Sequence, residues 1–382
     1  MIASARTVRL AVASLTTLFA LFNGTGTAHA TGGTGPAAVV SMGDSYISGE
    51  AGRWQGNSDD TSGSRDGTDR AYVGGSYDPT VVYGPTYASG CDRSDTAEIN
   101  SAPGLNATRF NIACSGATTA NVLRASDGGQ SFKGEAPQAD QLARIAASNN
   151  VQTVVLSIGG NDLGFTSVIT SCVEDYELWY SYCNGSQQQK IAAALPGAMA
   201  GVGKAIDSVN AAMASDGYAP GSYRIILQSY PSPIPRSSEN RYSESGWART
   251  STGGCPFWDG DSDWARDTLI PEISSALRNV ADAKGVQFLD LENALQGHEV
   301  CSTSTQLATP TQAPSAATSE WARFLTTGMT QGTEQESFHP NAYGEQALGH
   351  CLSLIAAQSS GDWSCTDTPG EDTSGMTLSA MP

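Results

Sequence analysis

The chain has 382 residues, a formal net charge of −18, 42 glycines and only 15% charged residues. This composition is typical of a compact, loop-rich globular protein rather than of a disordered or coiled-coil chain. The negative charge disfavours nucleic acid and anionic membranes as partners, whereas a neutral or zwitterionic substrate is compatible with it.

The N-terminus has the pattern of an export signal. Two arginines precede a mostly apolar stretch over residues 10–22, and Ala28 and Ala30 give the small-x-small spacing that precedes a cleavage site. We therefore predict that residues 1–30 are a signal peptide cleaved after Ala30 and that the mature protein is secreted. The apolar stretch is too short for a membrane anchor, and no later segment is long enough to span a bilayer.

Five apolar runs predict buried strands, and the segments between them predict helices. The strands are expected at residues 37–42, 108–113, 151–158, 223–228 and 286–291. The helices are expected at residues 137–149, 188–215, 264–284 and 341–357, with Pro196 breaking or kinking the second. This alternation predicts an α/β fold, a three-layer αβα sandwich around a mostly five-stranded parallel sheet. Sites in such sheets form at the carboxyl ends of the strands.

Two segments fall outside this pattern. Residues 52–95 are rich in Gly, Ser, Asp and Tyr and predict a surface loop. Its aromatic residues either line an acyl or sugar site or pack within the loop, and the sequence leaves both open: Trp54, Tyr72, Tyr77, Tyr83 and Tyr87. Residues 366–382 have no apolar period and predict a disordered tail, which leaves one domain over residues 31–365.

Eight cysteines follow the predicted signal peptide. An even number in an exported protein predicts disulfide bonds. Many pairings are possible, and we expect neighbours in sequence to pair: Cys91 with Cys114, Cys172 with Cys183, Cys255 with Cys301, and Cys351 with Cys365. No CxxC pair occurs, so a cysteine-based metal site is not expected.

The candidate nucleophile is Ser45, which follows the first predicted strand. A serine hydroxyl needs a neighbouring base. His339 lies just before the last helix, and Glu336 can curl back to accept a hydrogen bond from its imidazole. His298 and His350 are expected to be structural.

Four blocks then occur in a familiar order: residues 43–46 (GDSY), 111–118 (NIACSGAT), 159–162 (GGND) and 337–341 (SFHPN). This pattern resembles the GDSL/SGNH hydrolases over roughly residues 37–355, and within them the secreted actinobacterial (Streptomyces-type) lipases and phospholipases. The resemblance implies that Ser45 is the nucleophile. It also implies an oxyanion hole made by the backbone N–H groups of Ser45 and Gly116 and the side chain of Asn161.

One position departs from the family. The family usually has Asp three residues before the histidine, where this chain has Glu336. Either Glu336 serves as the acid, or a main-chain carbonyl orients His339 and the set is a dyad.

The expected activity is hydrolysis of carboxylic esters through an acyl-enzyme, without metal or cofactor, by a monomer. The favoured substrates are acyl esters of phospholipids, lysophospholipids or other lipids. A short-chain or carbohydrate (acetyl) esterase is the alternative. A more remote alternative is a secreted binding protein without catalytic activity, in which the four blocks are vestigial.

Overall fold

The computed structural model describes residues 33–60, 65–326 and 332–382. The predicted signal peptide and its cleavage site lie outside the described residues. The centre of the protein is a seven-stranded sheet with the order β4-β1-β5-β6-β7-β8-β9. Its strands are β1 (Ala37–Gly43), β4 (Thr108–Asn111), β5 (Asn150–Ser157), β6 (Arg224–Gln228), β7 (Gln287–Asp290), β8 (Trp363–Thr366) and β9 (Thr377–Ala380).

The five predicted strands are all present, side by side and parallel. In the middle of β1, Val40 is in register with Phe110 of β4 and with Val154 of β5. β1 and β5 are almost wholly buried, as expected when helices cover both faces of a parallel sheet. The sheet continues beyond the prediction, because β8 adds a parallel strand and β9 an antiparallel edge.

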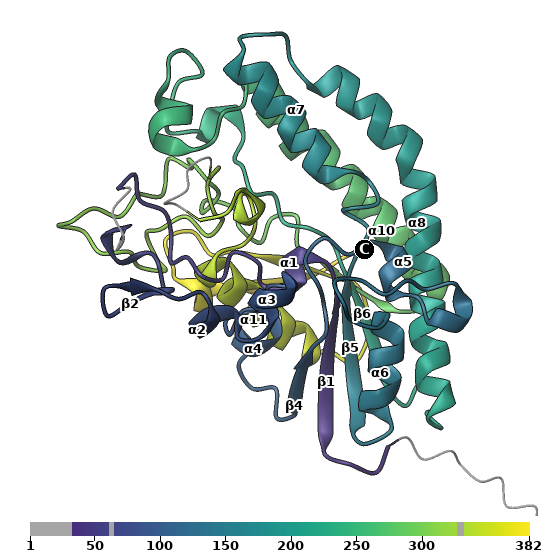
Figure 1. The fold of residues 1–382 in the computed structure, drawn as a ribbon. Helices are drawn as coiled ribbons and strands as arrows, with labels where there is room; N and C mark the ends of the chain where they lie inside the picture. The colour runs from purple at the N-terminus through teal and green to yellow at the C-terminus, as the bar shows by residue number, and fades with distance from the viewer. Residues whose placement is uncertain (1–32, 61–64, 327–331) are drawn as a thin grey trace, which may run out of the picture.

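Helices cover both faces of the sheet, which confirms the αβα sandwich (Figure 1). On one face, α8 (Asn184–Ser215) packs against α6 (Gln138–Ala146) and α10 (Ile270–Lys284). On the other face, α11 (Ala342–Ala356) packs against α4 (Glu98–Ser101). The remaining α-helices are α1 (Ser45–Ser48), α2 (Thr80–Tyr83), α3 (Thr86–Ser89), α5 (Thr119–Val122), α7 (Phe165–Glu177) and α9 (Asp259–Trp264).

Of the break or kink expected at Pro196, the break is wrong, because α8 continues through this residue as one helix of 32 residues. Proline leaves the carbonyl four residues earlier without its helical partner. Here that carbonyl belongs to Ala192, and both residues are exposed. Water can therefore hydrate the carbonyl, while the neighbouring turns pack against α6 and α10.

The disordered tail predicted at residues 366–382 is also wrong. Residues 377–380 form β9, which pairs with β8, and Met376 is buried. The backbone of Met381 donates to the carbonyl of Asp362. The composition is poor in apolar residues, but β8 offers an unpaired sheet edge, and pairing with it satisfies the backbone of the tail.

All four expected disulfides are confirmed: Cys91–Cys114, Cys172–Cys183, Cys255–Cys301 and Cys351–Cys365. Two of them tie main elements together. Cys172–Cys183 joins α7 to the residue that precedes α8, and Cys351–Cys365 joins α11 to β8.

The segment at residues 52–95 is more than a surface loop. It contains α2, α3 and the pair β2 (Tyr72–Val73) and β3 (Ser76–Tyr77). Trp54 is fully buried, with three guanidinium groups over its ring. The distances from guanidinium carbon to ring centroid are 4.4 Å for Arg53, 4.8 Å for Arg65 and 3.5 Å for Arg323. This charged core packs the segment against the residues that precede α11.

Within residues 33–60, 65–326 and 332–382, none of the helices combines the length and the apolarity that crossing a bilayer requires.

Candidate active site

Ser45 begins α1 directly after β1. The chain turns at Gly43, whose φ of 137° and whose closeness to the Ser157 carbonyl leave no room for a Cβ. Asp44 then caps α1 by accepting a hydrogen bond from the backbone of Tyr46 at 3.2 Å. The sharp turn brings the hydroxyl of Ser45 to the carboxyl edge of the sheet, where a cavity opens.

His339 reaches this cavity from the segment before α11. Asn341 is the N-cap of α11, and its side chain accepts from the backbone of Tyr343 and Gly344. Phe338 has a φ of 61°, a left-handed conformation that is strained for a bulky residue. Its carbonyl accepts a hydrogen bond from the hydroxyl of Tyr46 at 2.9 Å. These contacts hold the turn that directs His339 toward Ser45.

The two ring nitrogens of His339 have different partners. Nε2 lies 2.7 Å from Oγ of Ser45, and Nδ1 lies 3.1 Å from the carbonyl oxygen of Ser337. A carbonyl oxygen can only accept, so Nδ1 carries the proton and Nε2 is left to accept from the serine hydroxyl. Burial lowers the pKa of His339 to about 4, although its hydrogen bond to Ser337 raises it in part. The imidazole is therefore neutral and able to take a proton.

The structure corrects the expectation that Glu336 orients His339. Its carboxylate accepts from Trp54 Nε1 and from the Tyr83 hydroxyl, each at 3.0 Å, and from the backbone of Thr333 at 3.1 Å. One oxygen also lies 3.9 Å from Arg53. The position contacting Nδ1 is taken by the Ser337 carbonyl, which is the second alternative that the sequence left open.

Gly116 lines the same cavity as Ser45 and His339. Its φ of 82° is one that glycine adopts without strain, and the absence of a Cβ lets its backbone approach a bound group. Next to it, the hydroxyl of Ser115 accepts from the side chain of Gln335 at 2.6 Å. The glycine block is thus tied directly to the segment that carries His339.

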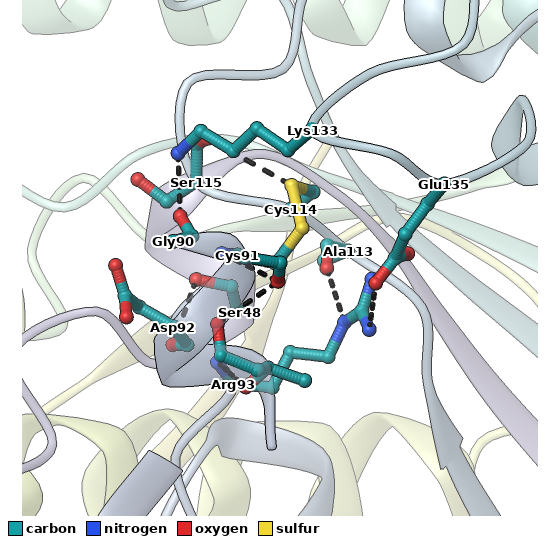
Figure 2. The surroundings of a disulfide bond; sticks show 12 residues. Ser48, Gly90, Cys91, Asp92, Arg93, Ala113, Cys114, Ser115, Lys133 and Glu135 are labelled. Atoms are coloured by element: carbon teal, nitrogen blue, oxygen red, sulfur yellow. Dashed lines mark hydrogen bonds and ion pairs between the residues drawn. A yellow bond between two sulfur atoms is a disulfide. The ribbon is translucent and has the colours of Figure 1, made fainter. Parts of the chain in front are cut away.

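The Cys91–Cys114 disulfide supports the strand end that leads to Gly116 (Figure 2). Beside it, Arg93 donates to the carbonyl of Ala113 at 2.5 Å and pairs with Glu135 at 2.5 Å. The block is also bonded to the end of β1, because the backbone of Cys114 donates to the carbonyl of Gly43 at 3.0 Å.

Asn161 lies just after β5 and also lines the cavity. Its side-chain amide donates to the carbonyl of Ala117 at 2.8 Å, which leaves a second N–H available. The next residue, Asp162, accepts from the backbone and the hydroxyl of Thr119 at 2.9 and 2.6 Å. Asp162 therefore has a structural role, because it joins the asparagine block to the residue that follows the glycine block.

Tyr230 is the site residue that sequence reasoning missed. Its hydroxyl donates to Asp44 at 2.5 Å and accepts from the backbone of Gly160 at 3.0 Å, and so links the serine and asparagine blocks. Burial raises the pKa of Asp44 to about 7, although the hydrogen bond from Tyr230 acts against the shift. The sequence could have indicated Tyr230 by its position, because it follows the strand β6 at the same carboxyl edge of the sheet.

The cavity at Ser45 has a volume of about 900 Å³. Phe165, Ile169 and Val173 recur every four residues along α7, so they lie on one face of the helix and form a wall. Further apolar side chains in the lining are Tyr46, Tyr230, Pro231, Ile270, Leu325 and Phe338. The lining also contains polar and charged residues, among them Lys133, Glu174 and Glu334. None of the five aromatic residues singled out in residues 52–95 belongs to this lining.

His298 and His350, the other histidines among the described residues, lie away from this lining. His298 stacks on Trp321 with ring centroids 3.8 Å apart, and its Nδ1 contacts the Ser319 carbonyl. His350 lies within α11. In the part of the chain that the structure describes, no cluster of three or more His, Cys, Asp or Glu residues is arranged to hold a metal ion.

The fold and the site define an α/β protein with a neutral histidine hydrogen-bonded to a serine at the carboxyl edge of a parallel sheet. Residues 42–347 match the family model described as GDSL-like Lipase/Acylhydrolase, and the chain belongs to this family. It is therefore a carboxylic ester hydrolase.

The chain shares a quarter or less of its residues with the individual relatives described next. The chain is 25% identical over 282 residues to Lipase 1 of Streptomyces coelicolor, which covers 70% of this chain and 82% of that protein. A solved extracellular lipase from Streptomyces rimosus is 22% identical, with a TM-score of 0.49 over 84% of this chain and 100% of that chain. Phospholipase A1 from Streptomyces albidoflavus NA297 is 22% identical, with a TM-score of 0.49 over 85% and 99% of the two chains.

The contacts of Glu336 predict that Glu336→Gln retains most of kcat but lowers the free energy of unfolding by about 3 kcal/mol, because a buried cluster of arginines loses a carboxylate. The amide substitution of a true triad acid instead lowers kcat by about 10⁴-fold. Steady-state kinetics on a soluble ester, together with urea unfolding, measure the two effects separately. A loss of kcat on that scale with unchanged stability would contradict the structural role.

Proposed function

We propose that Ser45 is the nucleophile and His339 the general base of the ester hydrolysis. His339 Nε2 takes the hydroxyl proton as Ser45 Oγ attacks the carbonyl carbon of the ester. The imidazolium then gives this proton to the departing alkoxide, which leaves as the alcohol and an acyl-enzyme. Water, activated by the same nitrogen, hydrolyses the acyl-enzyme to the free acid. The Ser337 carbonyl keeps the ring in the tautomer that this sequence needs.

Three donors stabilise the tetrahedral intermediates in this proposal: the backbone N–H groups of Ser45 and Gly116 and the side chain of Asn161. The support is their common location on one cavity and the unused N–H of Asn161. Fixed donors are effective because they need no reorientation when negative charge develops.

The substrates we propose are acyl esters of phospholipids, lysophospholipids or other lipids. The observation that carries this proposal is the apolar face of α7, which extends the cavity from Ser45 along Phe165, Ile169 and Val173. Apolar walls of this kind stabilise a long acyl chain in proportion to the area that they remove from water. The four disulfides support the further proposal that the enzyme acts after export.

The lowered pKa of His339 predicts an unusually acidic lower limit of activity. Only neutral His339 can accept the serine proton, so kcat/KM on a soluble ester should fall only as the pH drops through about 4. The measurement is kcat/KM against pH, with intrinsic fluorescence followed in parallel to separate acid unfolding. Asp44 contacts the site and has a pKa raised to about 7 by burial, so its own titration could change the rate. The variant Asp44→Asn removes this titration and serves as the control. Half-loss of activity near pH 6.5 would show that His339 is not held neutral.

Asn161→Ala should lower kcat by about 10²–10³-fold with little change in KM, because the hydrogen bond strengthens mainly in the transition state. Initial rates on a soluble ester give both constants, and a melting curve checks that the lost contact with Ala117 has not unfolded the loop. An unchanged kcat would remove Asn161 from the oxyanion hole.

The substrate class is tested with p-nitrophenyl esters of increasing chain length and with phosphatidylcholine. We expect kcat/KM to rise with chain length and phosphatidylcholine to release fatty acid. Ser45→Ala should abolish both this activity and labelling by a fluorophosphonate. A preference for acetyl esters, with no action on phosphatidylcholine, would instead favour the short-chain or carbohydrate esterase. Labelling that persists in Ser45→Ala would contradict the nucleophile.

A further inference from the structure

Large apolar side chains are exposed in two groups among the described residues. One group lies in residues 73–87. The other gathers where α7 ends and α8 begins, together with one tryptophan from a separate segment, and each of its members is 53–63% exposed. We call this second group the aromatic tip, and it consists of Leu178, Trp179, Tyr180, Tyr182 and Trp247.

Three of the five side chains of the aromatic tip, Trp179, Tyr182 and Trp247, are connected by ring contacts rather than scattered. Trp179 lies 6.1 Å from Trp247 and 5.7 Å from Trp258, measured between ring centroids. Tyr182 reaches the same Trp258 at 6.3 Å. Exposed aromatic residues that occur singly need no explanation, whereas a contiguous apolar patch on a soluble protein marks an interaction site.

The tip is held rigidly. The Cys172–Cys183 disulfide closes its base, and the carboxylate of Asp261 accepts from the backbone of Cys183 at 3.2 Å and of Asn184 at 2.9 Å. Trp179 itself has a φ of 55°, a left-handed conformation that is strained for a bulky side chain and usually belongs to glycine at a helix end. A tryptophan kept in this position at the surface points to a role for its exposed ring.

The aromatic tip continues the wall of the catalytic cavity. α7 contributes cavity-lining residues from Phe165 to Glu174, and the tip begins at Leu178, one helical turn later. Figure 1 shows α7 and α8 running together away from the sheet to a common end, beside the green segment that precedes α9. A molecule held at the tip therefore lies one helical turn beyond Glu174, the last residue of α7 that lines the cavity at Ser45.

The charged residues around the aromatic tip indicate which kind of lipid surface it can bind. No Lys or Arg occurs between Arg144 and Lys190, whereas Glu174, Asp175 and Glu177 all lie on the last part of α7. Beside Trp247, Arg249 is buried and pairs with Asp259 at 2.5 Å. This acidic border repels anionic lipid, while Trp and Tyr side chains favour the boundary between lipid and water.

We propose that the aromatic tip docks the enzyme on the surface of aggregated neutral or zwitterionic lipid and places α7 to guide an acyl chain to Ser45. This inference rests on the lipid substrates proposed above. The tip acts before the chemistry and contacts none of the reacting atoms, so its contribution appears with aggregated substrate and not with a soluble ester.

The test uses Trp179→Gly combined with Tyr180→Ser. Glycine adopts the φ of residue 179 without strain, so this substitution keeps the backbone of the tip. Tyr87→Ser is the matched control, since Tyr87 is an exposed tyrosine of the other group. Binding to phosphatidylcholine vesicles is measured by co-sedimentation in a Ser45→Ala background, so that the lipid is not consumed. Kinetics are measured in the active enzyme.

We expect the double variant to bind phosphatidylcholine vesicles at least about tenfold more weakly, because two large side chains no longer leave water on docking. Its kcat/KM on vesicles should fall in parallel, while its kcat/KM on p-nitrophenyl butyrate and its melting temperature stay close to those of the parent. Tyr87→Ser should leave all four quantities unchanged.

Three results would overturn the proposal. The first is unchanged vesicle binding in the double variant. The second is tighter binding of the parent to phosphatidylglycerol vesicles than to phosphatidylcholine. The third is a parent that ignores vesicles but forms a dimer, or binds an insoluble polysaccharide, through the tip. Failure of the lipid substrate class is seen separately, as a parent that binds phosphatidylcholine vesicles through the tip but releases no fatty acid from them.

Discussion

The hydrogen bond between Ser45 Oγ and His339 Nε2 is the contact on which the site depends, and it joins residues 294 positions apart. It forms only if the imidazole presents a nitrogen without a proton. The Ser337 carbonyl enforces this by occupying the other nitrogen. Since the carbonyl belongs to the same turn as His339, the ring is oriented by its own backbone. Two contacts hold this turn: the Tyr46 hydroxyl donates to the Phe338 carbonyl, and Asn341 caps the N-terminus of α11.

Because the Ser337 carbonyl orients His339, Glu336 has another role. Trp54 is buried beneath three arginine side chains, and buried guanidinium groups are stable only beside carboxylates. Asp69 pairs with Arg53 at 2.7 Å. Glu336 adds a second carboxylate, which accepts from the indole N–H of Trp54 and lies 3.9 Å from Arg53. Glu336 therefore binds the segment at residues 52–95 to the turn that carries His339. Its effect on the site is exerted through the placement of that turn.

The features predictable from sequence are those fixed by neighbouring residues. Apolar runs identified the five parallel strands. Ser45 and Asn161 directly follow two of them, so the sheet alone brings both to one edge. Pairing of neighbouring cysteines also followed from sequence order. The pairing of Ser45 with the distant His339 was expected from the four blocks, whereas distant contacts that no motif indicates were missed. The partners of Glu336 are Trp54 and Tyr83, more than 250 positions away, and the tail becomes ordered only because β8 presents an edge to it.

Tyr230 shows why the parts of the site hold together. The blocks after β1 and β5 each begin with a glycine at positive φ, Gly43 and Gly159, and such turns have little stiffness of their own. One phenol hydroxyl between Asp44 and Gly160 fixes both turns to the end of β6. α7 joins this edge at its first residue, because the backbone of Phe165 donates to the Gly160 carbonyl at 3.3 Å and its ring lies 6.1 Å from that of Tyr230. We infer that the later turns of α7, which line the cavity and lead to the aromatic tip, can vary while the reacting groups keep their geometry.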